Sequence, residues 1–83
     1  MKIGTVLFNT GVRDNHPYKY SIYTGQSNGK ASFIYPYDNG MNNGHYLMSD
    51  IGKDKPIQPI GHIDLQTLLK DAIQNVVDNQ SQT

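Results

Sequence analysis

The amino-acid sequence predicts a small α+β domain: an antiparallel β-sheet of three to four strands, connected as a meander and packed against one C-terminal α-helix. Asn-Gly pairs at residues 28–29, 39–40 and 43–44 punctuate the middle of the chain. Because both residue types adopt positive φ at low cost, each pair favours a chain reversal. Tyr-rich segments that alternate apolar and polar residues surround these pairs, and a helical apolar period begins near residue 64.

The alternation of apolar residues places four strands. The first expected strand carries apolar residues on both faces, which suits a central position. Pro36 lacks an amide hydrogen, so the end of the third strand is expected at a sheet edge. The predicted strands are residues 2–8, 18–24, 30–37 and 45–51, and together they form a sheet over residues 2–51. The connections are a five-residue hairpin loop at 25–29, a turn-rich loop at 38–44 and an extended Pro-containing linker at 52–63.

The helix is predicted over residues 64–79, followed by a polar tail at 80–83. Asp64 is a favourable N-cap, and Ile63 and Leu68 stand at the positions of a hydrophobic staple. Apolar residues then recur every three or four positions; they are Leu65, Leu68, Leu69, Ala72, Ile73, Val76 and Val77. We expect this stripe to cover one face of the sheet. The other face then keeps apolar side chains exposed, which usually marks an interface.

The length and the composition of the chain limit which classes of protein it can belong to. A chain of 83 residues is one domain, 1–83, and buries only about 60% of its unfolded surface, so pairing with a copy or a partner would stabilise it. The chain has no Cys, which excludes disulfides and thiolate metal sites and favours the cytoplasm. No segment is apolar enough to span a membrane. Seven basic residues balance seven acidic ones, which disfavours nucleic acid as a partner.

No pattern of catalytic or metal-binding residues emerges. Residues 25–31 depart from a phosphate-binding loop in spacing, and Ala31 replaces the residue that would hold magnesium. Residues 38–44 lack the glycine of a calcium loop at its sixth position. The imidazoles, His16, His45 and His62, are far apart in sequence. We therefore predict no catalytic residue, no metal site and no cofactor.

The leading functional hypothesis is a non-enzymatic binding protein, an anti-defence inhibitor of the kind found in phages and mobile elements, which docks on a larger host protein in the host cytoplasm. Tyrosine provides a large contact area at low entropic cost. The candidate binding residues are Tyr18, Tyr20, Tyr23, Tyr35, Tyr37, Tyr46, Arg13 and Lys30. A homodimer or higher oligomer is compatible with the same residues.

Two alternatives use the same side chains. An oligomer could hold a small molecule such as a nucleotide between subunits, stacked on tyrosine and contacted by Asn, Lys and Arg13. A sheet of aromatics flanked by cations could also bind single-stranded nucleic acid. The neutral net charge and the absence of a helix between the strands make this second alternative the weaker one.

Overall fold

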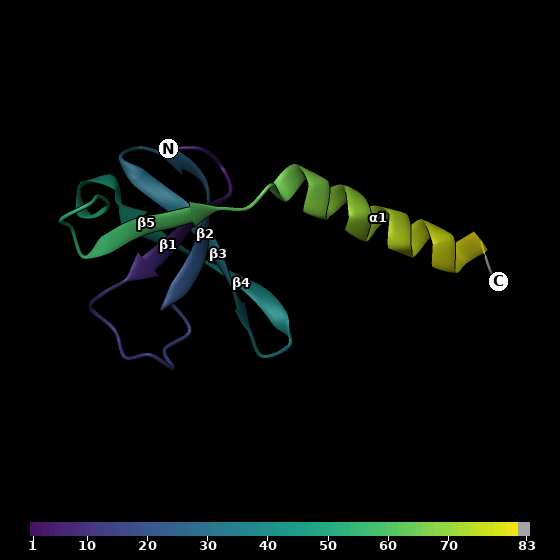
Figure 1. Ribbon diagram of the computed structural model, residues 1–83, viewed down its shortest axis with the longest axis horizontal. Coiled ribbons are helices and arrows are strands. Elements are labelled where there is room, and N and C mark those ends of the chain that lie inside the picture. The colour runs from purple at the N-terminus through teal and green to yellow at the C-terminus, as the bar shows by residue number, and fades with distance from the viewer. Residues whose placement is uncertain (82–83) are drawn as a thin grey trace.

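The computed structural model describes residues 1–81 and shows an α+β fold, as the sequence predicts. The elements are β1 (Thr5–Asn9), β2 (Tyr20–Ser27), β3 (Lys30–Tyr37), β4 (Gly40–Leu47), the 3-10 helix η1 (Met48–Asp50), β5 (Ile57–His62) and α1 (Leu65–Ser81). One antiparallel sheet contains all five strands in the order β4-β3-β2-β1-β5 (Figure 1). Strands β1 to β4 form the predicted meander, and β5 returns to lie beside β1.

Two-residue turns connect β2 to β3 and β3 to β4. All four central residues have positive φ: Asn28 (53°), Gly29 (76°), Asp38 (51°) and Asn39 (65°). Turns of this hand match the twist of the strands that they join. The bounds predicted for β3 are therefore confirmed, whereas the longer loops predicted at 25–29 and 38–44 are wrong because the strands continue up to each turn.

The third Asn-Gly pair lies inside β4 and makes no turn. Gly44 is directly opposite Phe33 of β3. A Cβ atom at Gly44 would lie 2.5 Å from Cζ of Phe33, so glycine is needed here to let the aromatic ring pack over the backbone. This requirement for close packing, which sequence alone does not distinguish from a turn, explains the wrong prediction.

The predicted linker at 52–63 contains a fifth strand that the sequence analysis missed. β5 pairs with β1 at the sheet edge, where Pro59 lies opposite Leu7 and a register irregularity follows at Val6. An edge strand tolerates proline because its outer side needs no hydrogen-bond donor. The strand bounds also differ from the predictions by a few residues, since residues 48–50 form η1 and Gly4, at φ 101°, precedes β1. α1 runs to Ser81, so the polar tail predicted at 80–83 is helical in its first two residues, and residues 82–83 lie outside the described part of the chain.

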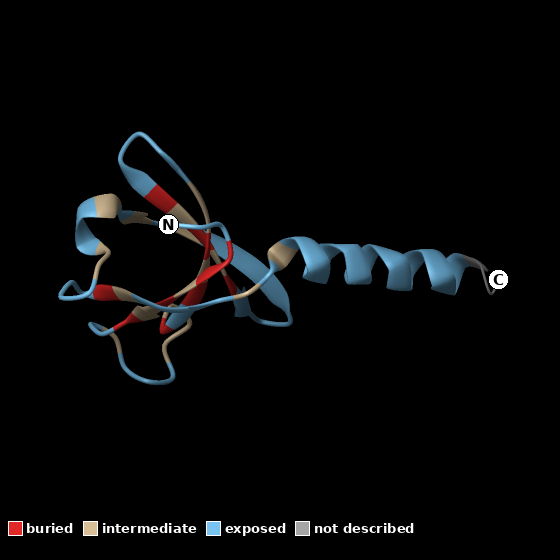
Figure 2. Ribbon diagram, turned by 45° about the horizontal axis from the view of Figure 1, so that its top comes forward, coloured by how far each residue is buried: buried red, intermediate tan, exposed pale blue. Residues whose placement is uncertain are grey.

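The core occupies one face of the sheet. Side chains that point to this inner face are buried: Leu7, Tyr23, Ala31, Phe33, Tyr35 and Ile57. In Figure 2 the buried residues lie in the strands and their connections, and α1 is exposed beyond its half-buried first residue, Leu65. The core is therefore built by the sheet, its loops and η1, without a contribution from the helix.

The expectation that the helix covers a face of the sheet is wrong. α1 projects from the end of β5 (Figure 1), and the chain measures 51 × 25 × 22 Å. Leu69 and Ile73 on its apolar side are 60% and 64% exposed. Only Ile63 and Asp64 separate β5 from α1, so the helix starts at the sheet edge and leads away from it.

Candidate protein-binding surfaces

The apolar side of α1 is the most exposed hydrophobic feature of the chain. Its large members are Leu68, Leu69, Ile73 and Val76, which are between 51% and 64% exposed; we call them the α1 stripe. Their spacing of three, four and seven residues places them on one side of the helix. Contact between such side chains and water is unfavourable, and a contiguous exposed patch of this kind marks an interaction site.

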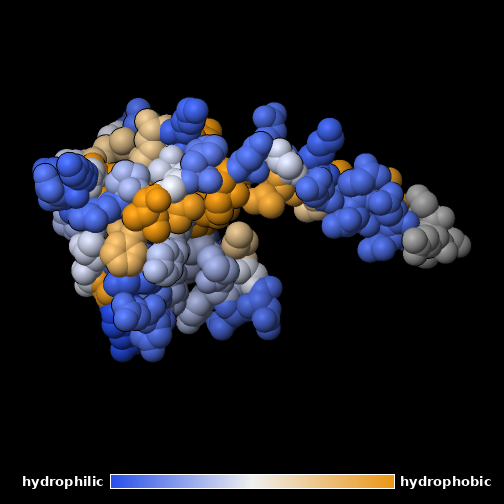
Figure 3. Space-filling view, viewed as in Figure 1, coloured by the Kyte–Doolittle hydropathy of each residue, from blue (hydrophilic) through white to orange (hydrophobic). Residues whose placement is uncertain are grey.

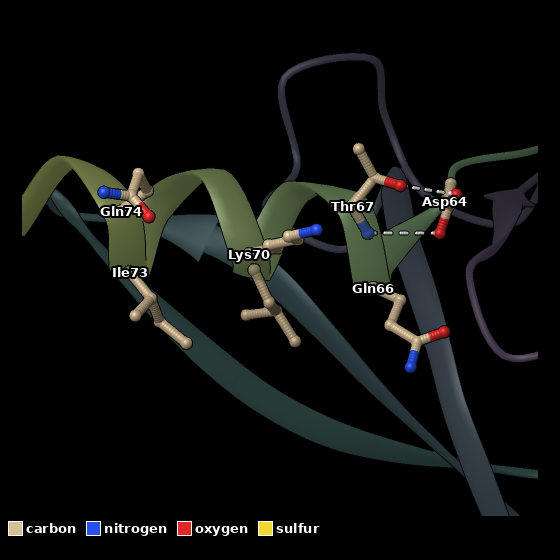
Figure 4. A pocket seen from close by; sticks show the side chains of 7 residues that line it. Asp64, Gln66, Thr67, Lys70, Ile73 and Gln74 are labelled. Atoms are coloured by element: carbon tan, nitrogen blue, oxygen red, sulfur yellow. Dashed lines mark hydrogen bonds between the residues drawn. The ribbon is translucent and has the colours of Figure 1, made fainter.

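Asp64 fixes the start of the helix. Its carboxylate accepts hydrogen bonds from the backbone N–H of Thr67 (3.2 Å) and from the Thr67 hydroxyl (2.7 Å), as Figure 4 shows. These bonds, the one from the Thr67 side chain first, lower the pKa of Asp64. The predicted N-cap is thus confirmed, and the cap defines where α1 begins.

A second contact ties the residue before the cap to the sheet. The backbone N–H of Ile63 donates to the carbonyl oxygen of Gly4 (2.8 Å), and the N–H of Gly4 donates to Tyr23 (2.8 Å). A side chain at Gly4, whose φ is 101°, would collide with the Ile63 carbonyl. Only Asp64 lies between this anchored residue and α1, which leaves the junction very short.

A groove lies in the angle between α1 and the sheet. It has a volume of about 500 Å³ and is lined mainly by apolar surface from Ile3, Leu65 and Leu69, beside Thr24 and His62. A larger hollow, of about 620 Å³, runs along α1 next to the same angle (Figure 4). Every residue that lines this second hollow belongs to α1 or its cap, so it is an open side of the helix.

The sheet face opposite the core carries a second apolar surface. Val6 lies across from Ile22, Ile22 across from Ile34, and Phe8 across from Tyr20. We call these five residues the outer sheet face. Tyr20 is 54% exposed and the other members are half-buried. In Figure 3 a hydrophobic band runs from the sheet onto the start of α1 on the side of the molecule that this view shows.

The six candidate tyrosines do not form one surface. Tyr23 and Tyr35 are 4% and 7% exposed and lie in the core. Tyr18 and Tyr46 are half-buried, and both pack on the ring of Phe33, with centroid distances of 5.6 and 4.2 Å. Only Tyr20 and Tyr37, at 54% and 48% exposure, present much of their surface to a partner.

Tyr35 shows how closely the buried aromatics are packed. Its ring centroid is 4.6 Å from that of Tyr18. A hydrogen bond with the Tyr18 side chain, together with burial, raises the pKa of Tyr35 to about 12. Burial also raises the pKa of Tyr46. These shifts follow from packing in the core and point to a structural role for both side chains.

The cationic candidates lie apart from one another. Arg13 is exposed in the loop between β1 and β2, and Lys30 is exposed at the start of β3. Lys19, which the sequence places near the aromatics, is buried: its Nζ donates to the carbonyl of Val12 (2.9 Å) and lies 4.6 Å from the centroid of Phe8. A continuous cationic strip along the aromatics is therefore not formed by these three residues.

The three histidines are also separated. Nδ1 of His16 accepts the backbone N–H of Tyr18 (3.0 Å), Nε2 of His62 lies 3.2 Å from the carbonyl oxygen of Ile3, and His45 is exposed on β4. Within residues 1–81, no group of three or more His, Cys, Asp or Glu side chains is placed to hold a metal ion. None of the helices in that same range is both long enough and apolar enough to cross a membrane.

The comparisons with known proteins give no relative. No protein-family model matches the chain, and neither the curated proteins nor the solved structures include a significant match. The candidate binding surfaces are therefore inferred from the exposure and packing of their side chains. The sequence did identify the residues of the α1 stripe, but it assigned them to the core, because an amphipathic period does not reveal which surface will cover it.

Proposed function

We propose that the protein is a non-enzymatic binding protein that acts by docking on another protein chain, with α1 as its main contact element. The observation that carries this proposal is the exposure of the α1 stripe, whose four large aliphatic side chains are more than half exposed on a capped helix. Presenting an apolar helix face to a groove or a sheet is a recurring mode of protein recognition. The hollow beside the stripe is open and is lined by the helix itself, which suits a protein surface better than an enclosed substrate.

A narrower form of the proposal is that the partner is a larger host protein in the cytoplasm, which this chain inhibits. Tyr20 and Tyr37 support it, since both are about half exposed and are of a residue type that often dominates binding energy. The Cys-free composition is in keeping with a reducing compartment. Tyr37, at the end of β3, belongs neither to the α1 stripe nor to the outer sheet face, so its contact with a partner is compatible with a separate contact of α1.

The test is to change the stripe without changing the fold. Leu69→Asp with Ile73→Asp places two charges on the stripe, and Gln66→Asp with Gln74→Asp adds the same charge at polar positions of the same helix. Masses of the protein and its complexes are measured by light scattering after gentle purification from the cells of origin. We expect only the stripe variant to lose its protein complexes while its sheet retains its thermal transition. Complexes that survive in the stripe variant would rule out α1 as the contact element.

A second candidate function is the binding of a small apolar molecule. The groove between α1 and the sheet, about 500 Å³, has the size of many ligand sites. Native mass spectrometry of the gently purified protein separates the two functions. A reproducible added mass of a few hundred daltons would favour the ligand, whereas masses that are sums of protein chains favour docking.

A further inference from the structure

We infer that the partner of the α1 stripe is a second copy of this chain, and that the stripe of each copy packs on the outer sheet face of the other, giving a homodimer with exchanged helices. This inference rests on the proposed function in one respect, namely that α1 is a contact element. It goes further by naming the occupant of the stripe and the surface on which the stripe lies.

The junction between β5 and α1 argues against closure of the helix on its own sheet. Ile63 is hydrogen-bonded to Gly4 of the sheet (2.8 Å), and Asp64 is used as the helix cap through its bonds to Thr67. To turn back over the sheet, the chain would have to break one of these contacts. A hinge this short favours exchange of an element between copies over closure within one copy.

The width of the stripe argues for a sheet as the covering surface. Leu68 and Leu69 are adjacent, and the apolar positions recur at both three and four residues, which gives a broad stripe typical of a helix that packs on a core. A two-helix coiled coil uses a narrower seam and needs roughly three to four heptads. α1 has 17 residues, which is fewer than three heptads. Two α1 helices alone would therefore make a poor pair.

The outer sheet face has the required size and chemistry. α1 is 17 residues long, or about 25 Å at a rise of about 1.5 Å per residue. The five strands span about 19 Å between the outermost strand axes at a spacing of about 4.8 Å. Val6, Ile22 and Ile34 form an aliphatic row on the three adjacent strands β1, β2 and β3, about 10 Å between the outer two strand axes, and the row is bordered by Asn43 on β4 and Gly61 on β5. Among residues 1–81 no element covers this row, since α1 projects away from the sheet.

The groove between α1 and the sheet brings the end of β2 next to the α1 stripe. Thr24 of β2 lines this groove together with Leu65 and Leu69 of the same chain. Ile22 of the outer sheet face lies two residues before Thr24 on β2, so the outer sheet face begins close to this concave corner. Two such corners related by a twofold axis can clasp, with each helix on the other copy's sheet and the same residues used on both sides.

The buried surface area favours two reciprocal helix-on-sheet contacts over one such contact. The footprint of α1, about 25 Å by about 10 Å, covers about 250 Å² of each surface. One such contact removes about 500 Å² in total, and two remove about 1,000 Å², which is about the lower limit for a specific interface. Formal net charge is zero at pH 7, so two copies do not repel each other.

Complementation between two variants tests the inference. Leu69→Asp damages the stripe and Ile34→Lys damages the outer sheet face, and either change should reduce the dimer to a single chain of 9.3 kDa. A mixture of the two variants should recover dimer, because one contact is then unchanged and the other sets the new carboxylate of the Leu69→Asp stripe against the new ammonium group of the Ile34→Lys face. Gln74→Asp is the control and should remain dimeric. A dimer that persists in Ile34→Lys would show that the sheet face is not used, and a mixture that stays monomeric would overturn the exchange.

Cross-linking locates the contact. The chain has no Cys, so Ser32→Cys on the outer side of β3 and Asn75→Cys, which borders the stripe seven residues after Leu68, introduce the only thiols. With a short bifunctional maleimide, the double variant should give a covalent dimer linked from one site to the other. Linkage within a single chain would show that α1 folds back on its own sheet. Linkage between two Asn75→Cys sites, without the mixed product, would show helix-to-helix packing; either result refutes the inference.

The mass of the unchanged protein separates failure of the inference from failure of the proposed function. A single-chain mass at all concentrations, combined with loss of a different protein partner in the stripe variant, would refute the homodimer and leave the function standing. A single-chain mass with no effect of the stripe variant on any complex would refute both. A mass of twice 9.3 kDa that falls to 9.3 kDa in the stripe variant supports both.

Discussion

Truncation of Leu69 to alanine is the sharpest single perturbation of the proposed interface. Leu→Ala removes three carbon atoms, and burial of each contributes about 0.8 kcal/mol, or about 2.4 kcal/mol for full burial. Because Leu69 is 60% exposed in one chain, about 1.4 kcal/mol of that total is gained only on dimerisation. A twofold dimer contains the site twice, so the change should weaken association by about 3 kcal/mol, or roughly 100-fold in Kd.

Sedimentation equilibrium over a range of protein concentrations measures this Kd directly. Gln74→Ala is the matched control, since it truncates a polar neighbour on the same helix, and its Kd should stay within a few fold of the unchanged protein. The thermal transition of the sheet, followed by circular dichroism at a concentration where the chain is monomeric, should hardly move in either variant. An unchanged Kd for Leu69→Ala, or a large loss of monomer stability, would refute the reasoning because it would place Leu69 outside the interface or inside a core.

Three further predictions concern the fold itself. Gly44→Ala should destabilise the sheet by about 1–3 kcal/mol, measured by denaturant unfolding, since the new methyl group overpacks against Phe33; unchanged stability would mean that the ring has room to move. The pKa of Tyr35 is about 12 in the folded chain against 10.0 for an ordinary tyrosine, so its neutral form stabilises the fold below about pH 10. That contribution should be lost as the pH rises from about 10 to about 12, and Tyr35→Phe should flatten this part of the pH dependence of the unfolding free energy. Asp64→Ala should lower the helical circular dichroism signal without lowering the melting temperature of the sheet, because it removes the cap of a helix that is not part of the core; equal loss of both signals would show that α1 and the sheet fold as one unit.

Local patterns were sufficient for much of the fold. The turn at Asn28-Gly29, the strand that follows it and the cap at Asp64 are all determined by residues close in sequence, and the structure confirms them. Gly44 and β5 were misassigned for a different reason. Gly44 is required by the ring of Phe33, and Pro59 is tolerated because β5 happens to lie at an edge. Both assignments depend on contacts with parts of the chain that are distant in sequence, and a local sequence pattern does not reveal such contacts.

The candidate site was predicted in part. The sequence identified the residues of the α1 stripe but not their exposure, since the same amphipathic period arises whether the covering surface belongs to the same chain or to another. Tyrosine likewise serves cores and interfaces equally well. The structure places Tyr23 and Tyr35 in the core and leaves Tyr20 and Tyr37 exposed, a division that depends on strand register. Register is set by the turns and by the buried face together.

The central claim is that the α1 stripe lies on the outer sheet face of a second copy, and magnetic resonance on a mixed sample tests it most directly. One copy carries isotope-labelled methyl groups and the other does not, so that only contacts between copies are detected. The account predicts intermolecular cross-peaks that join methyl groups of Leu69 and Ile73 to those of Ile22 and Ile34. Cross-peaks between α1 methyl groups alone, or none at concentrations where the mass is doubled, would contradict it.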